Sequence, residues 1–121
     1  MQVIGHNAYR YDDVFLVPLL ERVFADDLQL GGAANNIKFM RTRFLEFRDS
    51  FALLTGSLKR LGQEFAVPHQ KLDVDATSFA AADFDDPAKC AKIREYCERD
   101  VLCLSEVYGS VFELMRSIVA E

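Results

Sequence analysis

Short hydrophobic blocks alternate with polar residues along this chain of 121 residues, and the spacing of the hydrophobic positions changes between segments. Residues 2–7 form a short apolar stretch that predicts a strand ending in a polar corner. Residues 12–28 have helical spacing, with Pro18 tolerable near the first turn or as a kink. The apolar stripe of this helix is expected at Leu16, Leu20 and Val23.

The middle of the chain changes to a period of two. The Gly- and Asn-rich stretch at residues 29–36 predicts a turn, including Gly31-Gly32. Two short alternations follow at residues 37–39 and 45–48, which predict a hairpin or two adjacent strands. Residues 56–67 then resume helical spacing through Leu58, Leu61 and Phe65.

The last third of the chain is predicted to be a loop followed by a long helix. Residues 68–86 have little periodicity, and Asp86 with Pro87 has the pattern of an N-cap and a first helical position. The helix after it is expected to bury one stripe, consisting of Val101, Leu104, Tyr108, Val111 and Met115. Because there is no internal repeat and no linker, we expect one α/β domain over residues 1–121, helix-rich with a small sheet.

Composition restricts the class of protein. No run of 18 apolar residues is present, so no membrane span is expected, and the first residues lack the pattern of a secretory signal. Three cysteines are typical of reduced intracellular thiols, and their spacings of seven and six favour helix packing over zinc. Neither histidine has a second histidine at metal-ligand spacing, and His6 is expected to be a structural hydrogen-bonding residue.

The net charge of −5 is unevenly distributed. Between Ile37 and Arg60, six basic residues face only Glu46 and Asp49, a local balance of +4, which leaves −9 for the rest. On charge alone a solvated hairpin is the favoured explanation of this strip, and a surface that faces phosphates is the alternative.

Two groups of residues point to a shared chemistry. Tyr96 and Asp100 lie four residues apart on one helix face, where a phenol and a carboxylate could share a metal-bound water. Such pairs are common in helices. At the start of the chain, Asn7 is followed after three residues by the aromatic Tyr11 and by Asp12. In this order the two groups resemble the second and third exonuclease motifs of family B DNA polymerases.

Two elements between these motifs are similar to the protein-primed branch of that family, found in organellar linear plasmids and viruses. Ser57-Leu58-Lys59-Arg60-Leu61 looks like its Ser/Thr-Leu-x-x-hydrophobic element, which contacts a single-stranded primer end. Lys71-Leu72-Asp73-Val74 looks like its Lys-x-x-hydrophobic element. The resemblance covers nearly the whole chain and implies a partial RNase H-like fold of the DEDDy exonuclease type, in a viral or organellar replication context.

The resemblance also implies roles for individual residues. Asp12 and Asp100 would be carboxylate ligands of Mg²⁺ or Mn²⁺, with Tyr96 positioning the attacking water and Lys71 steadying the scissile phosphate. Asp13 is expected at the surface or in a supporting position. The 3′-terminal nucleotides of single-stranded DNA would be held by Asn7, Ser57 and Leu58, with phosphate contacts from Lys59 and Arg60.

The chain departs from the family pattern at its start. The first exonuclease motif, Asp-x-Glu on an early strand, is absent, and residues 1–5 contain no carboxylate. Asp73-Val74-Asp75 and Asp83-Phe84-Asp85 have similar spacing but fall in the wrong order. Motifs for nucleotide addition are absent as well. We therefore expect a fragment of the exonuclease domain without its N-terminal strands, with an exposed sheet edge.

Whether these residues form an enzyme stays open at this point. Activity alone should be weak or absent, and a polypeptide that supplies the missing Asp-x-Glu strand is an expected partner. One alternative is a non-catalytic module that retains the fold for protein contact or single-strand binding. Another is a stand-alone nuclease of the same superfamily acting on RNA, although the Ser-Leu element favours the polymerase branch.

Overall fold

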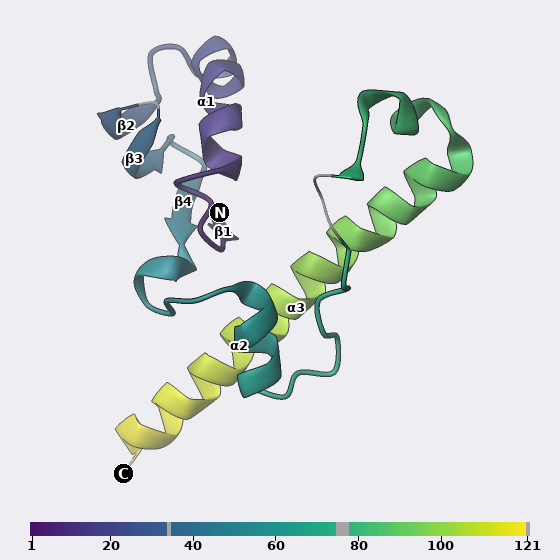
Figure 1. Cartoon of the computed structure of the whole chain (residues 1–121). Helices are drawn as coiled ribbons and strands as arrows, with labels where there is room; N and C mark the ends of the chain where they lie inside the picture. Colours follow the sequence, from purple (N-terminus) through teal and green to yellow (C-terminus); the bar gives the residue numbers. More distant parts are fainter. Residues whose placement is uncertain (34, 75–77, 121) are drawn as a thin grey trace. The chain divides into compact units, whose positions relative to one another are not determined.

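The computed structural model describes residues 1–33, 35–74 and 78–120. The chain forms two compact units, Met1–Thr55 and Gly56–Glu121, each with its own elements (Figure 1). The expected α/β class with a small sheet is confirmed. The assignment of one exonuclease domain to residues 1–121 stays a prediction.

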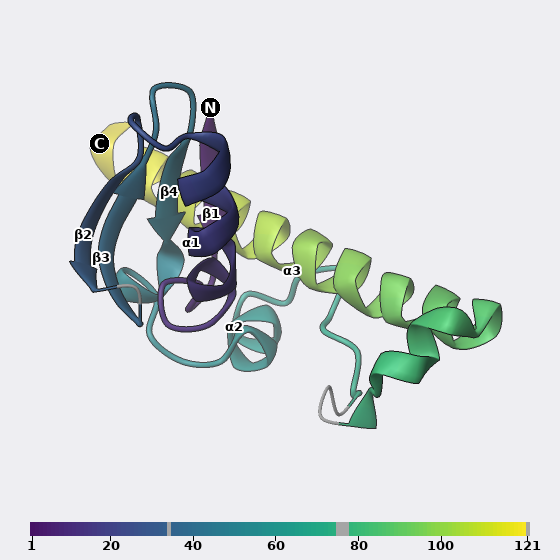
Figure 2. The ribbon, with the colours of Figure 1, turned by 90° about the horizontal axis from the view of Figure 1, so that it is seen from above.

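The first unit is a small mixed sheet with one helix. Its strands have the order β1-β4-β3-β2; β1 and β4 are parallel and the other pairs antiparallel. Figure 2 shows α1 lying against this sheet. The predicted first strand, first helix and hairpin are confirmed. The elements are β1 (Gln2–Gly5), α1 (Asp12–Val23), β2 (Gln29–Ala33), β3 (Asn36–Arg41), β4 (Glu46–Asp49) and the short 3₁₀ helix η1 (Ser50–Ala52).

The core of this unit joins α1 to β3 and β4. Val17 and Leu20 of α1 are buried with Ile37, Met40 and Phe47. The predicted helix stripe was therefore wrong in part, since Leu16 and Val23 are exposed and the buried face continues through Asp13. Because the buried face of α1 includes the carboxylate of Asp13, the spacing of apolar residues alone does not identify it.

The prediction of a turn at residues 29–36 was wrong for its first half, because β2 occupies Gln29–Ala33. The geometry of the sheet requires glycine at both Gly31 and Gly32. A Cβ on Gly31 would lie 2.2 Å from the Phe39 ring, so only glycine leaves room for that ring. Gly32 has φ +86° at the bulge between β2 and β3, a conformation that other residues avoid.

The second unit packs a short helix against a long one. It contains α2 (Leu58–Glu64), the 3₁₀ helix η3 (Ala81–Asp85) and α3 (Pro87–Ala120). The predicted helix start is confirmed, because Asp86 accepts hydrogen bonds from the amides of Ala88 and Lys89 at 3.0 and 3.4 Å. None of the helices in the described part of the chain has the length and hydropathy needed to cross a membrane.

The predicted stripe on α3 was wrong in part. Its members Leu104, Tyr108 and Val111 are half-buried. The buried residues of α3 are Ile93, Cys103 and Val107, whereas Val101 and Met115 are exposed. The buried face is set by the packing of α2, where Gly62 approaches so closely that a Cβ would lie 2.9 Å from the Cys103 sulfur. All three cysteines are free thiols, and Cys103 is fully buried, as expected for a packing role.

Candidate functional site

Lys71, Tyr96 and Asp100 come together in the second unit. The Lys71 ammonium lies 3.3 Å from Asp100 Oδ2 and 5.4 Å from the centroid of the Tyr96 ring. The Tyr96 ring also meets that of Phe79, whose centroid is 5.8 Å away in an edge-to-face arrangement. Three residues that the sequence separates by up to 29 positions therefore form one cluster, and all three are predicted catalytic residues.

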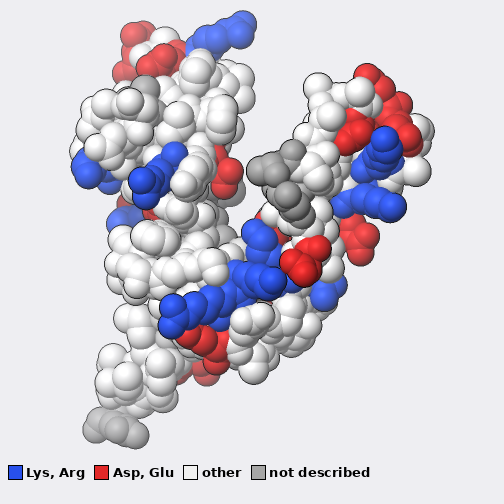
Figure 3. Space-filling view, in the orientation of Figure 1, with Lys and Arg blue, Asp and Glu red and all other residues white. Residues whose placement is uncertain are grey.

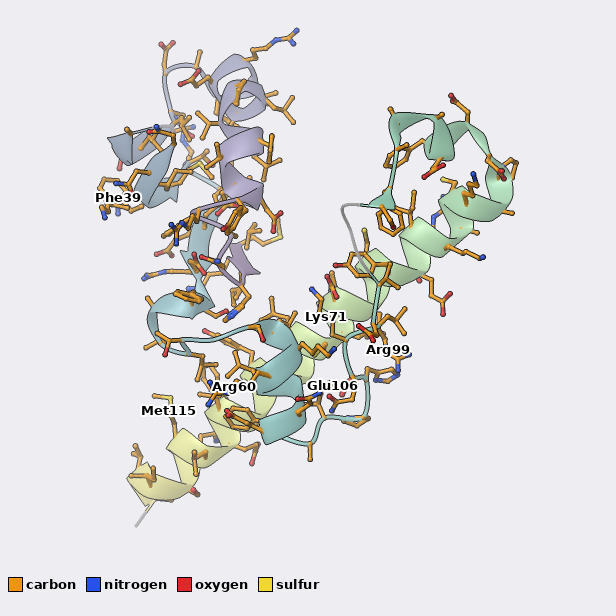
Figure 4. The ribbon with its side chains drawn as sticks, viewed as in Figure 1. Phe39, Arg60, Lys71, Arg99, Glu106 and Met115 are labelled. Atoms are coloured by element: carbon orange, nitrogen blue, oxygen red, sulfur yellow. The ribbon has the colours of Figure 1, made fainter. Side chains whose placement is uncertain are left out.

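Several hydrogen bonds fix the segment that carries Lys71. The Gln70 side chain donates to the carbonyls of Gly62 and Val67 at 2.7 and 2.8 Å, which ties the segment to the end of α2. Arg99 on α3 donates to the Gln70 carbonyl at 2.8 Å. One residue earlier, His69 is held by Glu106 through both its backbone amide and its ring. Figure 4 shows Lys71, Arg99 and Glu106 in this region.

Lys71 and Asp100 form the charged part of this cluster. Burial lowers the pKa of Lys71, but the attraction of Asp100 and a hydrogen bond with the Tyr96 side chain outweigh it, so the pKa is raised above its ordinary value. The side chains of Lys71 and Asp100 are only 26% and 28% exposed. This pair is therefore a half-buried ion pair, more strongly coupled than a surface salt bridge.

One oxygen of this ion pair has no partner. Asp100 Oδ1 is buried and accepts no hydrogen bond from the described residues. Buried oxygens of this kind are rare and fit a cation that a structure does not contain. Neither unit, within residues 1–33, 35–74 and 78–120, brings three His, Cys, Asp or Glu side chains together as a metal cluster. The described residues therefore offer one unpartnered carboxylate oxygen here, and a metal site stays a prediction.

The corner at the end of β1 is held by the carboxylate of Asp49. Its Oδ1 accepts from the amides of Asn7 and Phe51 at 2.7 and 3.0 Å, and its Oδ2 accepts from the Tyr9 amide at 3.1 Å. Asn7 has φ 58°, in the left-handed region that asparagine tolerates better than most residues. Asn7 is therefore held in an uncommon conformation by a residue 42 positions away.

His6 belongs to the same corner, and its hydrogen-bonding role is confirmed. Its ring Nδ1 lies 2.9 Å from Ser50 Oγ, and that hydroxyl donates to the Gly5 carbonyl at 3.1 Å. The ring also packs at 5.5 Å from that of Phe51. His6 thus joins the end of β1 to the end of β4.

The two adjacent carboxylates at the start of α1 have opposite environments. Asp12 is exposed, whereas Asp13 is only 5% exposed. The expectation that Asp13 could lie at the surface was therefore wrong. Burial raises the pKa of Asp13 to about 6, and repulsion from Asp49 and Asp12 adds to this.

The predicted DNA-binding residues of α2 have local structural partners. Ser57 Oγ accepts from the Arg60 amide at 3.2 Å and caps the helix, while Leu58 is buried. Lys59 lies 3.4 Å from Asp73, and Arg60 lies 2.8 Å from Glu64 on the next turn. Figure 3 shows basic side chains gathered over α2 and the nearby part of α3. The DNA-binding assignment of these four residues stays a prediction.

Neither Asp-x-Asp sequence forms part of the cluster in the described residues. Asp75 lies outside the described part of the chain, so the sequence from Asp73 to Asp75 cannot be placed as a pair. In η3, Asp83 accepts from the Ala80 amide at 2.9 Å and pairs with Lys89 at 3.4 Å. Asp83 therefore stabilises the start of the short helix η3.

The predicted site residues divide between the two units. Asn7 and Asp12 belong to the first unit, and Lys71, Tyr96 and Asp100 to the second. A shared metal centre between Asp12 and Asp100 therefore stays a prediction. Sequence reasoning missed Gln70 and Arg99, because nothing in their spacing indicates that they hold Lys71.

Comparison with known proteins supports the resemblance. The family model described as DNA polymerase type B, organellar and viral, matches residues 1–86. This match includes the segments of Asn7, Asp12, Ser57 and Lys71, and it ends before Tyr96. No curated protein and no solved structure matches the chain.

Proposed function

The chain belongs to the organellar and viral family of type B DNA polymerases, and on that premise we propose that it forms part of their RNase H-like 3′–5′ proofreading exonuclease domain. In this role it would hold a frayed single-stranded 3′ end for removal of the terminal nucleotide. The observation that carries the proposal is the cluster of Lys71, Tyr96 and Asp100, with its unpartnered carboxylate oxygen.

Each residue of the cluster suits a step of phosphodiester hydrolysis. Lys71 is a mobile point charge that can turn from Asp100 to a non-bridging phosphate oxygen. Tyr96, whose ring contacts both Lys71 and Phe79, can orient a water through its hydroxyl. Asp100 would supply an oxygen to Mg²⁺ or Mn²⁺, with Asp12 as a second ligand. The bound cations would neutralise charge on the attacking and leaving oxygens.

Contacts with the DNA strand are assigned to two elements that precede Lys71 in the sequence, around Asn7 and at residues 57–60. The Asn7 side chain would contact the terminal nucleotides together with Ser57 and Leu58. Capping uses the Ser57 oxygen only as an acceptor, so its O–H remains chemically able to donate to a phosphate. Lys59 and Arg60 are exposed and need only exchange a surface carboxylate for a phosphate.

We expect these 121 residues to be nearly inactive alone, because they contain no early Asp-x-Glu strand. Without that strand, Asp12 and Asp100 would be too few carboxylate ligands for two cations. Among the described strands, β1 pairs only with β4 and forms one edge of the sheet. A strand from another polypeptide can add to such an edge through backbone hydrogen bonds. A partner that supplies Asp-x-Glu in this way would complete the ligand set.

A nuclease assay tests the prediction that the chain alone is nearly inactive. The purified chain is incubated with a 5′-labelled single-stranded DNA and Mg²⁺ or Mn²⁺, and shortening from the 3′ end is followed on a gel. We expect no measurable shortening. Robust digestion that disappears in the Asp100→Ala variant would overturn the claim.

Cation binding gives a second readout that needs no activity. Millimolar Mn²⁺ should broaden the amide signals of Asp100 and Lys71 in NMR spectra, and Asp100→Asn should remove this broadening. Asp73→Asn is the matched control, because Asp73 is an exposed carboxylate that faces Lys59 instead of the cluster. Equal broadening in wild type and Asp100→Asn would contradict the ligand assignment.

A non-catalytic single-strand-binding module is the second candidate function, and the exposed basic side chains over α2 favour it (Figure 3). It predicts that Asp12→Ala and Asp100→Ala leave the binding of single-stranded DNA unchanged. Charge reversal at Lys59 and Arg60 would abolish the interaction instead. The two candidates therefore differ in which pair of substitutions matters.

A further inference from the structure

The face of the sheet opposite α1 has an aromatic ring surrounded by basic side chains. Because Met40 is buried against α1, its neighbours Phe39 and Arg41 point to the opposite face. Arg41 pairs across the strands with Glu46, and the same register continued by one step places Arg48 opposite Phe39. An open depression of about 380 Å³ lies on this face, lined by Tyr9, Lys38, Phe39, Arg41, Arg48 and Asp49 among others.

The Phe39 ring packs closely against the backbone of the neighbouring strand. It pairs with Gly31, and a Cβ at Gly31 would lie 2.2 and 2.3 Å from two carbons of its ring. The ring therefore occupies the space that a side chain at Gly31 would need, while Phe39 remains 46% exposed. Figure 4 shows Phe39 at β2 and β3. A ring held in this way is a rigid apolar platform that loses little freedom when another ring stacks on it.

The charges around this ring are suited to phosphate. The Arg41 guanidinium carbon is 5.6 Å from the ring centroid, and its Nε donates to the neutral Gln29 side chain at 2.6 Å. Within the described residues, neither Lys38 nor Arg41 has a carboxylate within 4.0 Å. The acidic residues nearby are already engaged, because Glu46 pairs with Arg48 at 2.5 Å and Asp49 accepts three backbone amides.

We propose that this sheet face binds single-stranded nucleic acid, with one base stacked on Phe39 and adjacent phosphates contacting Lys38 and Arg41. Exposed aromatic side chains on open sheets stack unpaired bases, and nearby cations track the backbone. Duplex DNA does not fit, because its bases are already stacked on both faces. Asp12, Lys71, Tyr96 and Asp100 are not among the residues that line this depression, and the proposal does not depend on the exonuclease assignment.

Fluorescence anisotropy with a labelled 12-nucleotide oligothymidylate tests the proposal on the whole chain. Phe39→Leu removes the ring but keeps an apolar side chain, and should weaken binding about 10-fold or more. Phe39→Tyr should retain binding. Phe44→Leu is the matched control, because Phe44 is also exposed and has an arginine carbon 5.9 Å from its ring, yet it lies in the β3–β4 turn. It should change binding less than about twofold.

An abasic oligonucleotide of equal length separates stacking from charge. Phe39→Leu should bind it as wild type does, whereas Arg41→Gln should weaken both strands and reduce the salt slope of log Kd by about 0.7. Parallel titrations with oligouridylate decide between DNA and RNA. Absence of binding by wild type, equal binding by wild type and Phe39→Leu, or an equal loss on the abasic strand would each overturn the proposal.

The result of this binding test can be distinguished from the result of the tests of the proposed exonuclease role. Asp100→Asn and Asp12→Asn should leave the difference between wild type and Phe39→Leu intact, because they lie outside the platform. If cation binding at Asp100 fails its test, the Phe39 result still decides whether the sheet face binds a strand. Circular dichroism spectra and melting curves of every variant confirm that each retains its fold.

Discussion

Replacing the buried carboxylate at the start of α1 by its neutral isostere, Asp13→Asn, should stabilise the first unit in a pH-dependent way. The pKa of Asp13 is raised to about 6 from an ordinary value near 3.8, chiefly by burial. Between these values the folded chain binds more protons than the unfolded chain, so stability falls as pH rises. A difference of about two pKa units corresponds to roughly 3 kcal/mol, which is lost in full above pH 6.

Urea denaturation at pH 4, 6 and 8 measures this effect, with circular dichroism for the whole chain and amide hydrogen exchange for β3 and β4. At pH 8 the Asp13→Asn variant should exceed wild type by up to about 3 kcal/mol, and the gain should vanish near pH 4. Asp26→Asn, an exposed carboxylate after α1, is the control and should show no such trend. A stability difference that does not vary with pH would refute the reasoning, as would an Asp13 pKa near 4 measured by NMR.

Three further substitutions test how the site residues are held. Ala66 follows α2 with φ 51°, so Ala66→Gly should stabilise the second unit by about 1 kcal/mol in urea denaturation. Asp49→Ala removes the acceptor of three amides and should cost about 3 kcal/mol, with faster hydrogen exchange at the β1 corner. Asn7→Ala should cost about 1 kcal/mol because of its positive φ, whereas Asn7→Gly should keep the fold. If the Asn7 side chain contacts DNA, both variants should weaken binding of a single strand.

The parts of the fold that follow local rules were predictable from the sequence. Alternation at residues 37–39 and 45–48 identified β3 and β4, and Asp86-Pro87 marked the start of α3 correctly. These signals depend on neighbours within a few residues, which a sequence displays directly. The first strand and the first two helices were found for the same reason.

The errors have a common physical origin in contacts between distant segments. Gly31 looked like a turn residue, yet it lies in β2, where the ring of Phe39 occupies the space that a side chain would need. The buried face of α3 passes through Cys103, because Gly62 of α2 packs there, and no spacing within α3 indicates this. Asp13 lies on the buried face of α1, against its chemical character. In each case the partner that decides the structure is far away in the sequence.

The candidate site combines features that the sequence predicts with contacts between distant segments that it does not predict. The types and order of Asn7, Asp12, Ser57, Lys71, Tyr96 and Asp100 could be read from the sequence, and the family match over residues 1–86 supports the first four segments. The contact of Lys71 with Asp100 could not, because it requires Gln70 and Arg99 to hold a loop against α3. Since those two residues contact neither Tyr96 nor Asp100 in the described hydrogen bonds, their effect on chemistry would be indirect. They would keep the Lys71 ammonium beside a carboxylate that has one oxygen left to bind a cation.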